Sequence, residues 1–374
     1  MISAQNKQLT LHKHPQIDIT SSMNKITLGI LGGGQLGRMS ALAAANLGIS
    51  VVIFTSEKNS PASLVAAKTI IADYTDERAL KEFSKIVDVI SYEFENIPIE
   101  TIHFLQKLKP VYPNEKLLEV SQDRRSEKNF LGSIKIPTGR YAPVDKPQDM
   151  LDTLEKWNAD SCILKTTRFG YDGKGQARYT SDSNIDTLWT QFNGAPLIME
   201  EIIDFDCEIS VIVARDATGK TIHYDPGLNE HKNHILSKTT VPAPLDKNVL
   251  SEAVSLAEKL AKDVNLRGVL TLELFVTKDN RLLANEIAPR THNSGHWTID
   301  ACAHSQFENH VRAVCGLPVI EPHRHSPCEM HNLIGDDINL IEKYQRQENA
   351  CLHDYGKQDI RPGRKMGHIT ILKD

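Results

Sequence analysis

The sequence contains no apolar run that approaches the length of a membrane-spanning helix, so we expect no integral membrane segment and no membrane partner. Excess positive charge is missing as well. The formal net charge of −5 gives no general attraction for nucleic acid, which excludes nucleic acid as a partner on electrostatic grounds. Any phosphate site must therefore be a local group of cations.

Closely spaced cysteines are also missing. The six cysteines stand at positions 162, 207, 302, 315, 328 and 351 without a CxxC pair, which is typical of reduced thiols and favours a cytoplasmic protein. The first 23 residues have no apolar core and so do not form a signal peptide. We expect residues 1–24 to be a disordered tail or the product of a misassigned start.

The N-terminal part has the pattern of an open parallel sheet, in a chain whose 374 residues suggest two or three domains. A strand at 26–31, a G-x-G-x-x-G loop at 32–37, a helix at 38–47 and a strand at 50–54 form a βαβ unit. Glu57 lies near the position of a ribose-binding acid, so a nicotinamide enzyme has to be considered. Further strands at 69–72 and 87–92, with a helix at 76–85 between them, extend this sheet to about residue 111.

The segment Glu93-Phe94-Glu95-Asn96 follows the fourth of these strands, where open sheets bind ligands. Two acids and an amide could hold a substrate with hydroxyl or amine groups. They could instead cap a helix that starts near Pro98, and both interpretations stay open for Glu95 and Asn96. For Glu93 we favour a role in function.

A glycine-rich loop at 165–176 lies between an apolar strand at 162–164 and a return strand at 177–179. Glycines let backbone amides turn inward and the cations add charge, so the loop is suited to cover a polyphosphate. No Gly-Lys-Ser/Thr opens a helix here, which excludes a Walker A loop. On this loop alone, an ordinary hairpin with solvated charges is equally consistent.

Strands and helices alternate through the middle of the chain, and Asn114 and Asp123 are placed to cap two short helices. The strand at 208–215 alternates in a way that predicts a half-exposed antiparallel strand. The other predicted elements are strands at 139–142 and 196–201 and helices at 115–120, 124–131, 148–157, 184–192 and 248–264.

An acidic hairpin is the second informative feature. Strands at 269–276 and 282–287 are joined by a turn at 278–280, and Glu273 and Glu286 lie at nearly equal distances from that turn. Two carboxylates that converge in an apolar sheet would repel, and Mg²⁺ shared with phosphates is the usual remedy. A raised-pKa acid pair, or side chains that face outward, is the alternative; Asn285 and the upstream loop favour the metal.

The last two polar segments carry histidines and cations. His292 and His296 have the spacing of a metal pair, but Gly295 argues against a regular helix, and a loop that presents Arg290 and His292 to an anionic intermediate fits better than zinc. From residue 317 the chain resembles a small β-rich cap. For its basic run we favour phosphate binding over a solvated face. The cations of that run are Lys357, Arg361, Arg364, Lys365 and His368.

Five motifs resemble the ATP-grasp superfamily and, within it, the N5-carboxyaminoimidazole ribonucleotide synthase family. They are Gly-Ile-Leu-Gly-Gly-Gly-Gln-Leu-Gly-Arg-Met at 29–39, Tyr-Glu-Phe-Glu-Asn at 92–96, Gly-Tyr-Asp-Gly-Lys-Gly-Gln at 170–176, Asn-Glu-Ile-Ala-Pro-Arg-Thr-His-Asn-Ser-Gly-His-Trp-Thr at 285–298 and Gly-Arg-Lys-Met-Gly-His at 363–368. The resemblance implies an α/β protein with an ATP-grasp fold, an N-terminal open parallel-sheet (Rossmann-like) domain and a small β-rich C-terminal domain. The implied domains are a pre-ATP-grasp domain at 25–122, an ATP-grasp domain at 123–316 with a lid at about 137–195, and a C-terminal domain at 317–374.

The resemblance also implies a reaction: ATP and Mg²⁺ drive the carboxylation of 5-aminoimidazole ribonucleotide by bicarbonate, through carboxyphosphate, in purine biosynthesis. The family is commonly dimeric, so a homodimer is expected. Three rival functions stay open: a nicotinamide dehydrogenase, suggested by the βαβ unit; another ATP-grasp ligase such as a formate-dependent glycinamide ribonucleotide transformylase or a biotin carboxylase, implied by the resemblance; and a non-catalytic nucleotide-binding module. Paired acids and a lid loop argue against the last.

The resemblance assigns roles to individual residues. The predicted contacts to ATP phosphates are Arg124, Lys165 and the amides of Gly170, Tyr171, Asp172, Gly173, Lys174, Gly175 and Gln176. The rest of the nucleotide would contact Glu200, Glu201, Ile202 and Ile203 at the adenine, Glu208 at the ribose, and His231. Glu273 and Glu286 would ligate Mg²⁺ beside Asn285. The predicted catalytic residues are Arg290, His292, Tyr171 and Asp172, and the predicted ribonucleotide-binding residues are Gln35, Glu93, Lys357 and Arg364.

Overall fold

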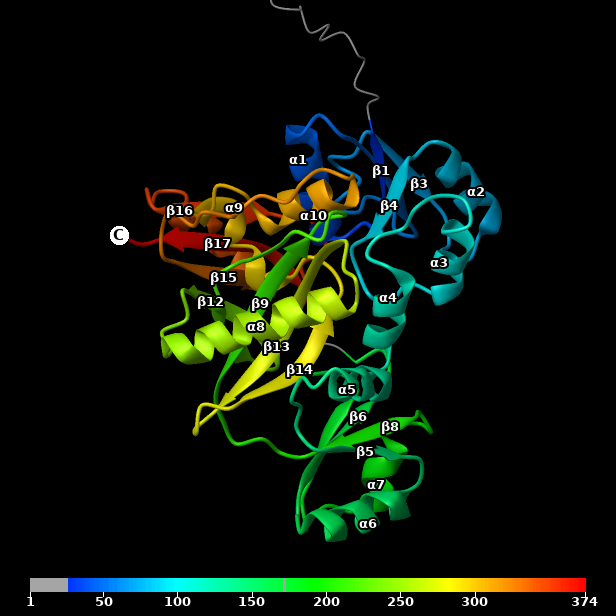
Figure 1. Cartoon of the computed structure of the whole chain (residues 1–374), viewed down its shortest axis with the longest axis vertical. Coiled ribbons are helices and arrows are strands. Elements are labelled where there is room, and N and C mark those ends of the chain that lie inside the picture. Colours follow the sequence, from blue (N-terminus) through cyan, green and yellow to red (C-terminus); the bar gives the residue numbers. More distant parts are fainter. Residues whose placement is uncertain (1–25, 171–172) are drawn as a thin grey trace, which may run out of the picture.

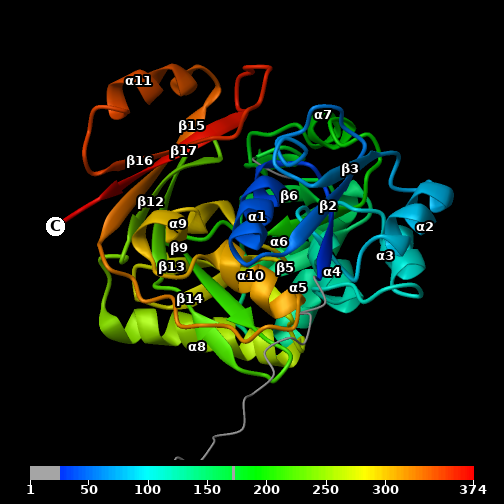
Figure 2. The same ribbon diagram turned by 90° about the horizontal axis from the view of Figure 1, so that it is seen from above.

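The structure is a computed structural model that describes residues 26–170 and 173–374. The expected N-terminal tail and the predicted catalytic residues Tyr171 and Asp172 lie outside the described residues. The described chain forms three sheets, with helices on their faces (Figure 1 and, turned by 90°, Figure 2). Among the described helices, none combines the length and the apolar character needed to cross a bilayer.

The N-terminal sheet is parallel, as the sequence predicts. Its strand order is β3 (Lys68–Ile71), β2 (Ser50–Thr55), β1 (Thr27–Leu31) and β4 (Val89–Tyr92). Its helices are α1 (Gln35–Asn46), α2 (Glu77–Lys85) and α3 (Ile99–Leu105). The apolar side chains of β1, β2 and β4 are almost fully buried, which explains why this run of short strands forms the core of the region.

Two short helices, α4 (Glu115–Gln122) and α5 (Arg124–Ser133), lead out of this sheet. Both predicted caps are confirmed, because the side chains of Asn114 and Asp123 accept hydrogen bonds from the backbone N–H groups of Leu117 and Ser126. The chain then enters the second sheet, at the bottom of Figure 1. Its antiparallel strand order is β5 (Tyr141–Val144), β8 (Leu197–Glu200), β6 (Cys162–Thr166) and β7 (Gln176–Tyr179), and its helices are α6 (Pro147–Trp157) and α7 (Ile185–Thr190).

The third sheet is the largest and runs through the rest of the chain. Its order is β14 (Leu282–Ala288), β13 (Gly268–Thr277), β9 (Phe205–Arg215), β11 (Gly227–Lys232), β12 (Ile235–Val241), β15 (Cys328–Ile334), β17 (Lys365–Leu372) and β16 (Ala350–Asp354), with β10 (Thr221–His223) beside β9. The helical elements of this part are α8 (Lys247–Asp263), α9 (Thr298–Ala301), α10 (Gln306–Val314), α11 (Ile341–Tyr344) and two 3-10 turns, η1 (Asn293–Gly295) and η2 (Gly335–Leu340).

Two predictions about this sheet need correction. The strand predicted to be half-exposed, β9, is a central strand between β13 and β11, and its residues 209–214 are buried. Helix α8 packs against β9 and β13 through a shared apolar cluster, which covers one face. The C-terminal strands are the predicted β-rich unit, but they continue the large sheet, because β15 pairs with β12. We propose that the domain boundaries fall near residues 122 and 316, as the sequence indicates.

Candidate active site

Three carboxylates gather on three neighbouring strands of the large sheet. Glu273 of β13 lies directly opposite Glu286 of β14, as the hairpin pattern predicted. Glu208 lies on β9, the other neighbour of β13. Burial raises the pKa of Glu273 well above its usual range, and Glu286 and Glu208 add to this effect. Burial and Glu286 likewise raise the pKa of Glu208 to about 7. Such a donor set suits a hard divalent cation, whose charge would relieve this repulsion.

Two cationic or polar side chains border these acids. Arg124 Nη1 lies 3.4 Å from Glu286 Oε2, and Arg124 Nη2 lies 3.4 Å from the carbonyl oxygen of Gly170 at the glycine-rich loop. His292 Nε2 lies 3.4 Å from Glu273 Oε1. Burial and then Arg290 lower the pKa of His292 to about 3, so its imidazole is neutral at physiological pH. Arg124 therefore joins the acids to the loop, as a phosphate-binding residue requires.

The predicted hairpin around the glycine-rich loop is confirmed, with β6 and β7 paired from Cys162 to Lys165. Thr166 N–H donates to the carbonyl of Gly175 across the base of the loop. Gly175 has φ +70°, and a Cβ there would lie 2.5 Å from Thr166 Oγ1, so only glycine fits this close approach. The loop therefore joins β6, which carries Lys165, to β7. Its described residues include Gly170, Gly173, Lys174, Gly175 and Gln176.

The predicted adenine segment begins at the end of β8. Lys165 Nζ lies 2.6 Å from Glu200 Oε2, and the other carboxylate oxygen of Glu200 is buried without a hydrogen-bond partner among the described residues. Burial alone would raise the pKa of Glu200, but Lys128 and Lys165 lower it to about 2.

The side chains after Glu200 differ in their contacts. Glu201 accepts from Arg140, Ile203 packs against Gly139, and Ile202 is exposed. His231 Nδ1 lies 3.5 Å from Glu208 Oε2. The predicted nucleotide-binding residues therefore extend from Glu200 at the end of β8 to Glu208 and His231 in the large sheet.

A buried ion pair links the N-terminal sheet to the polar segment after β14. Arg290 Nη2 donates to Glu95 Oε1 over 3.0 Å, and a second contact joins Nε to Oε2. Burial alone would raise the pKa of Glu95, but Arg290 lowers it to about 2. The capping interpretation of Glu95 is wrong, because α3 begins at Ile99 and has no side-chain cap. An ion pair was not among the interpretations considered for Glu95 from the sequence; in the structure, this pair orients the guanidinium of Arg290.

The predicted ribonucleotide residues converge from the two ends of the chain. Glu93 accepts from the N–H groups of Gly34 and Gly37 at the start of α1, over 2.8 and 3.3 Å, and Gln35 is the first residue of that helix. Burial raises the pKa of Glu93, and Lys357 is one of the cations that oppose this effect. Burial and Arg364 in turn lower the pKa of Lys357 to about 8. The Glu93 carboxylate thus occupies the N–H groups at the start of α1, and Lys357 and Arg364 are the nearby cations that could bind an anionic group.

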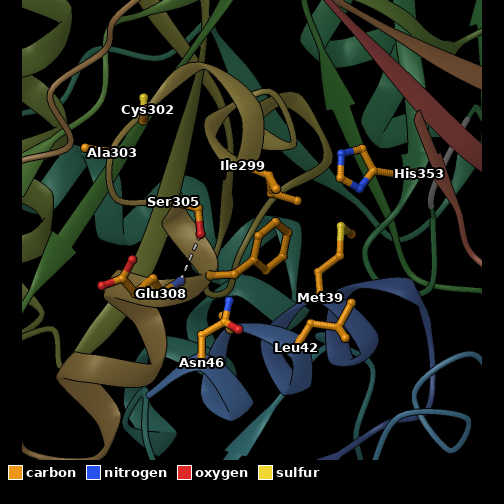
Figure 3. Close-up of a pocket in the computed structure, with 11 residues that line it drawn as sticks. Met39, Leu42, Asn46, Ile299, Cys302, Ala303, Ser305, Glu308 and His353 are labelled. Carbon is orange, nitrogen blue, oxygen red and sulfur yellow. Dashed lines mark hydrogen bonds between the residues drawn. The ribbon is translucent and has the colours of Figure 1, made fainter. Parts of the chain in front are cut away.

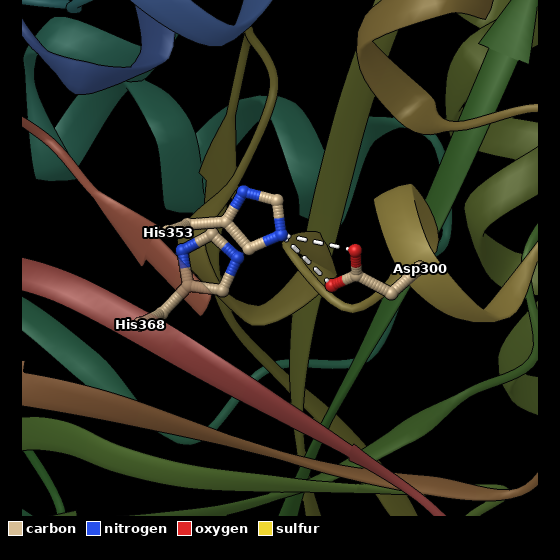
Figure 4. A group of neighbouring side chains, drawn as sticks. All are labelled: Asp300, His353 and His368. Carbon is tan, nitrogen blue, oxygen red and sulfur yellow. Dashed lines mark hydrogen bonds and ion pairs between the residues drawn. The ribbon is translucent and has the colours of Figure 1, made fainter. Parts of the chain in front are cut away.

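A group of buried and half-buried histidines lies beside this region. Asp300, His353 and His368 are close enough to suggest a metal site, and Figure 4 shows the two imidazole rings stacked, with the carboxylate facing His353. The rings are 6° from parallel, with centroids 4.3 Å apart. A histidine nitrogen binds a metal in the plane of its ring, and nearly parallel planes share no such point, so one cation cannot take both rings.

The histidines are instead joined by hydrogen bonds. His353 Nε2 lies 3.0 Å from both oxygens of Asp300, and Tyr355 OH contacts Nδ1 of His296 and of His368 over 3.0 and 2.9 Å. The zinc pair considered for His292 and His296 gains no support: η1 separates them, and neither belongs to the three-residue group found among the described residues. The network fixes β16 and β17 against the segment that carries His292.

A separate hollow of about 250 Å³ lies between α1 and α10 (Figure 3). Met39, Leu42 and Phe307 give it an apolar lining, and His353 closes one side. None of the predicted site residues lines it. The hollow is therefore separate from the candidate active site described above.

Two buried charged residues near Glu286 were not predicted from the sequence to belong to the site. Glu127 and Lys128 of α5 are only 2 % and 3 % exposed and contact β14 beside Glu286. A signal was available, because Arg124, Glu127 and Lys128 stand at i, i+3 and i+4 and so share one face of a helix. Charged residues at this helical spacing, next to predicted apolar strands, would have identified Glu127 and Lys128 as candidate site residues.

Comparison with protein families matches three consecutive parts of the chain. Residues 23–122 match the ribonucleotide synthetase preATP-grasp domain, residues 129–307 the ATP-grasp domain, and residues 328–374 the phosphoribosylaminoimidazole carboxylase C-terminal domain. These parts correspond to the parallel sheet, to the second sheet together with the acidic strands, and to the C-terminal strands.

Individual relatives agree with these matches. The chain is 46% identical over 359 residues to N5-carboxyaminoimidazole ribonucleotide synthase of Brucella melitensis, covering 96% of this chain and 99% of the relative. It resembles a solved structure of N5-carboxyaminoimidazole ribonucleotide synthetase in complex with ADP, with a TM-score of 0.90, 39% identity and coverage of 94% and 93%. It also resembles the Aspergillus clavatus enzyme in complex with ADP and 5-aminoimidazole ribonucleotide, with a TM-score of 0.85, 28% identity and coverage of 94% of each chain.

Proposed function

The chain belongs to the N5-carboxyaminoimidazole ribonucleotide synthase family of ATP-grasp ligases, and on that premise we propose how its residues divide the reaction among them. The reaction is the ATP-dependent carboxylation of 5-aminoimidazole ribonucleotide, a step of purine biosynthesis that forms a C–N bond. This assignment replaces the dehydrogenase suggested by the N-terminal glycine loop. The observation that carries the proposed mechanism is the pair Glu273 and Glu286, which face one another beside Arg124 and Arg290.

Glu273 and Glu286 are the proposed ligands of Mg²⁺, with Asn285 beside them. When bound, the ion would neutralise phosphate charge and hold the terminal phosphate in place for transfer. Arg124 and Lys165 are the proposed contacts to the phosphates, together with the amides of residues 170–176. The support is geometric, because Arg124 bridges Glu286 and Gly170. These groups would act through their positions and charges, so the proposed mechanism requires little proton transfer from them.

The adenine and ribose would lie along β8 and β9. Glu200 has a buried oxygen without a partner among the described residues, which suits a hydrogen-bond donor on the base. Glu208 is the proposed ribose ligand, and His231 approaches it from β11. Glu201, Ile202 and Ile203 would complete the adenine side through their backbone and apolar atoms.

Bicarbonate is the proposed source of the carboxyl group, and carboxyphosphate the proposed intermediate. Arg290 is the proposed contact to this anion, and its ion pair with Glu95 would hold the guanidinium plane in one orientation. His292 is neutral, so it would donate or accept one hydrogen bond without adding charge. Tyr171 and Asp172 are proposed to meet both substrates. Gln35 and Glu93 would contact the ribonucleotide, and Lys357 and Arg364 its phosphate.

We further propose a cytoplasmic homodimer that needs no nucleic acid or membrane partner. All six cysteines are free thiols, which supports a reducing compartment. The dimer rests on the family alone.

Phosphate release from ATP tests the whole assignment. We expect hydrolysis to require Mg²⁺ and to rise strongly when bicarbonate and 5-aminoimidazole ribonucleotide are both present. Glycinamide ribonucleotide with formate is the control acceptor pair and should have no effect. Stimulation by that pair instead would assign the chain to a different ATP-grasp ligase.

The pKa of Lys357 predicts a pH dependence for ribonucleotide use. This pKa is lowered to about 8, so the ammonium is present below pH 8 and is lost as the pH rises above it. We expect the KM for 5-aminoimidazole ribonucleotide to be flat near pH 7 and to rise above pH 8 by up to about tenfold per pH unit. Steady-state kinetics between pH 6.5 and 9.5 measure this. In Lys357→Arg the cation does not titrate, and the same profile in that variant would contradict the assignment.

A further inference from the structure

Helix α5 contacts the outer edge of β14, the strand that carries Glu286 (Figure 1). Because β14 ends the sheet, the backbone groups on that side have no neighbouring strand apart from an isolated bridge between Ala284 and Thr138. Glu127 Oε1 accepts from the N–H of Ile287 over 2.6 Å. Lys128 Nζ donates to the carbonyls of Ala284 and Asn285 over 3.1 and 2.9 Å. Two consecutive residues of one helix thus hold the backbone on both sides of Glu286.

This arrangement is costly as a purely structural contact. Glu127 and Lys128 are almost completely buried, and buried charges lose hydration that apolar side chains would not lose. An apolar face would attach α5 to β14 without that cost. An apolar face would not fix the orientation of individual peptide groups of β14. Hydrogen bonds with Glu127 and Lys128 do fix it, because they are directional.

The same helix face also reaches the side chain of Glu286. Arg124 lies one turn before Glu127 and Lys128, and its Nη1 contacts Glu286 Oε2. The helix therefore sets both the backbone and the carboxylate of this one residue. Arg125 points elsewhere, to the carbonyls of Val144 and Leu197 in the second sheet, so the contact to β14 is specific to one face.

We propose that Glu127 and Lys128 are positioning residues, which orient Glu286 toward the metal by fixing β14 on both sides of it. This inference rests on the proposed role of Glu286 as a metal ligand. Groups that hold a metal ligand in place typically contribute roughly 10–100-fold to metal affinity. Loss of the Lys128 contacts should therefore weaken the metal site without removing any ligand.

Binding of Mn²⁺ to the ADP complex, followed by electron paramagnetic resonance, tests this without turnover. We expect Lys128→Met to raise the Mn²⁺ dissociation constant about tenfold, while metal-free ADP affinity changes by a smaller factor, through loss of the Lys128 charge near Glu200. Lys128→Arg keeps a donor toward both carbonyls and should restore most of the affinity. Glu127→Gln keeps an acceptor for Ile287 and should stay near the wild-type value, whereas Glu127→Leu removes it and should also raise the Mn²⁺ dissociation constant, which provides a second test if Lys128→Met folds poorly.

Arg267→Met is the matched control. Arg267 also donates to two consecutive backbone carbonyls, those of Ala313 and Val314, but does so at the start of β13. It should lower the melting temperature and leave Mn²⁺ affinity unchanged. If Lys128→Met behaves in the same way, its role is structural only and the inference is wrong. If Glu286→Gln fails to weaken Mn²⁺ binding, the proposed metal role of Glu286 is wrong, and the inference falls with it.

Discussion

Replacement of Glu286 by glutamine is expected to lower turnover by about 10³-fold while the protein stays folded. Glutamine keeps the shape of the side chain but removes one of the charges that would hold Mg²⁺. A 10³-fold loss corresponds to about 4 kcal/mol of transition-state stabilisation, which is reasonable for a group that neutralises phosphate charge. The fold should survive, because Glu286 faces the buried Glu273 and a neutral amide relieves their repulsion.

The measurement is kcat at saturating ATP, Mg²⁺, bicarbonate and 5-aminoimidazole ribonucleotide, together with a thermal melt. Glu258→Gln is a suitable control, because Glu258 of α8 pairs with the exposed His223 of β10 and neither residue belongs to the proposed site. Near-normal turnover of Glu286→Gln would show that Glu286 is not a ligand. A large fall in melting temperature would mean that the loss of activity is not specific.

Replacement of Arg364 by alanine is expected to raise the KM for 5-aminoimidazole ribonucleotide by roughly 10–100-fold. A charged hydrogen bond contributes about 1.5–3 kcal/mol, and each ~1.4 kcal/mol corresponds to a factor of ten. Arg364 Nη1 donates to the carbonyl of Asp359 over 2.9 Å, so the guanidinium is oriented before the substrate binds. The charge of Arg364 helps to lower the pKa of Lys357, and the charge of Lys357 opposes the rise in the pKa of Glu93. The KM for ATP should change little, because the lost contact belongs to one substrate.

Kinetics with each substrate varied in turn decide between the two sites. The same basic run provides the control: Arg361 pairs with the carboxylate of Asp359 at 2.7 Å and is exposed, so Arg361→Ala should leave both constants nearly unchanged. A large rise in the KM for ATP with an unchanged ribonucleotide constant would move Arg364 to the nucleotide site.

Local patterns predicted the acidic hairpin and the N-terminal sheet well. The register of Glu273 and Glu286 follows from two strands and a short turn, which involve only neighbouring residues. The caps at Asn114 and Asp123 are likewise local. Such features are encoded within a few residues, so a single sequence is enough to find them.

Features that depend on distant contacts were harder to predict. Glu95 and Arg290 are 195 positions apart, and nothing near Glu95 distinguishes an ion pair from a helix cap. The strand β9 alternates as a half-exposed strand would, yet α8 covers it on one face and the sheet continues on both edges. The pairing of β15 with β12 joins segments almost 90 residues apart, which no local pattern encodes.

That pairing has a consequence for the design of inhibitors. Through it, the acids on β13 and β14 and the cations next to β16 and β17 belong to one continuous hydrogen-bonded sheet, whereas Glu200 and Lys165 belong to another. A compound that spans Glu273, Glu286 and Lys357 would contact groups that are positioned by one sheet. A compound that also contacts β6 and β8 would bridge two sheets that no strand pairing joins, and ordering two such elements costs binding free energy. Equal contact area should therefore give tighter binding in the first design.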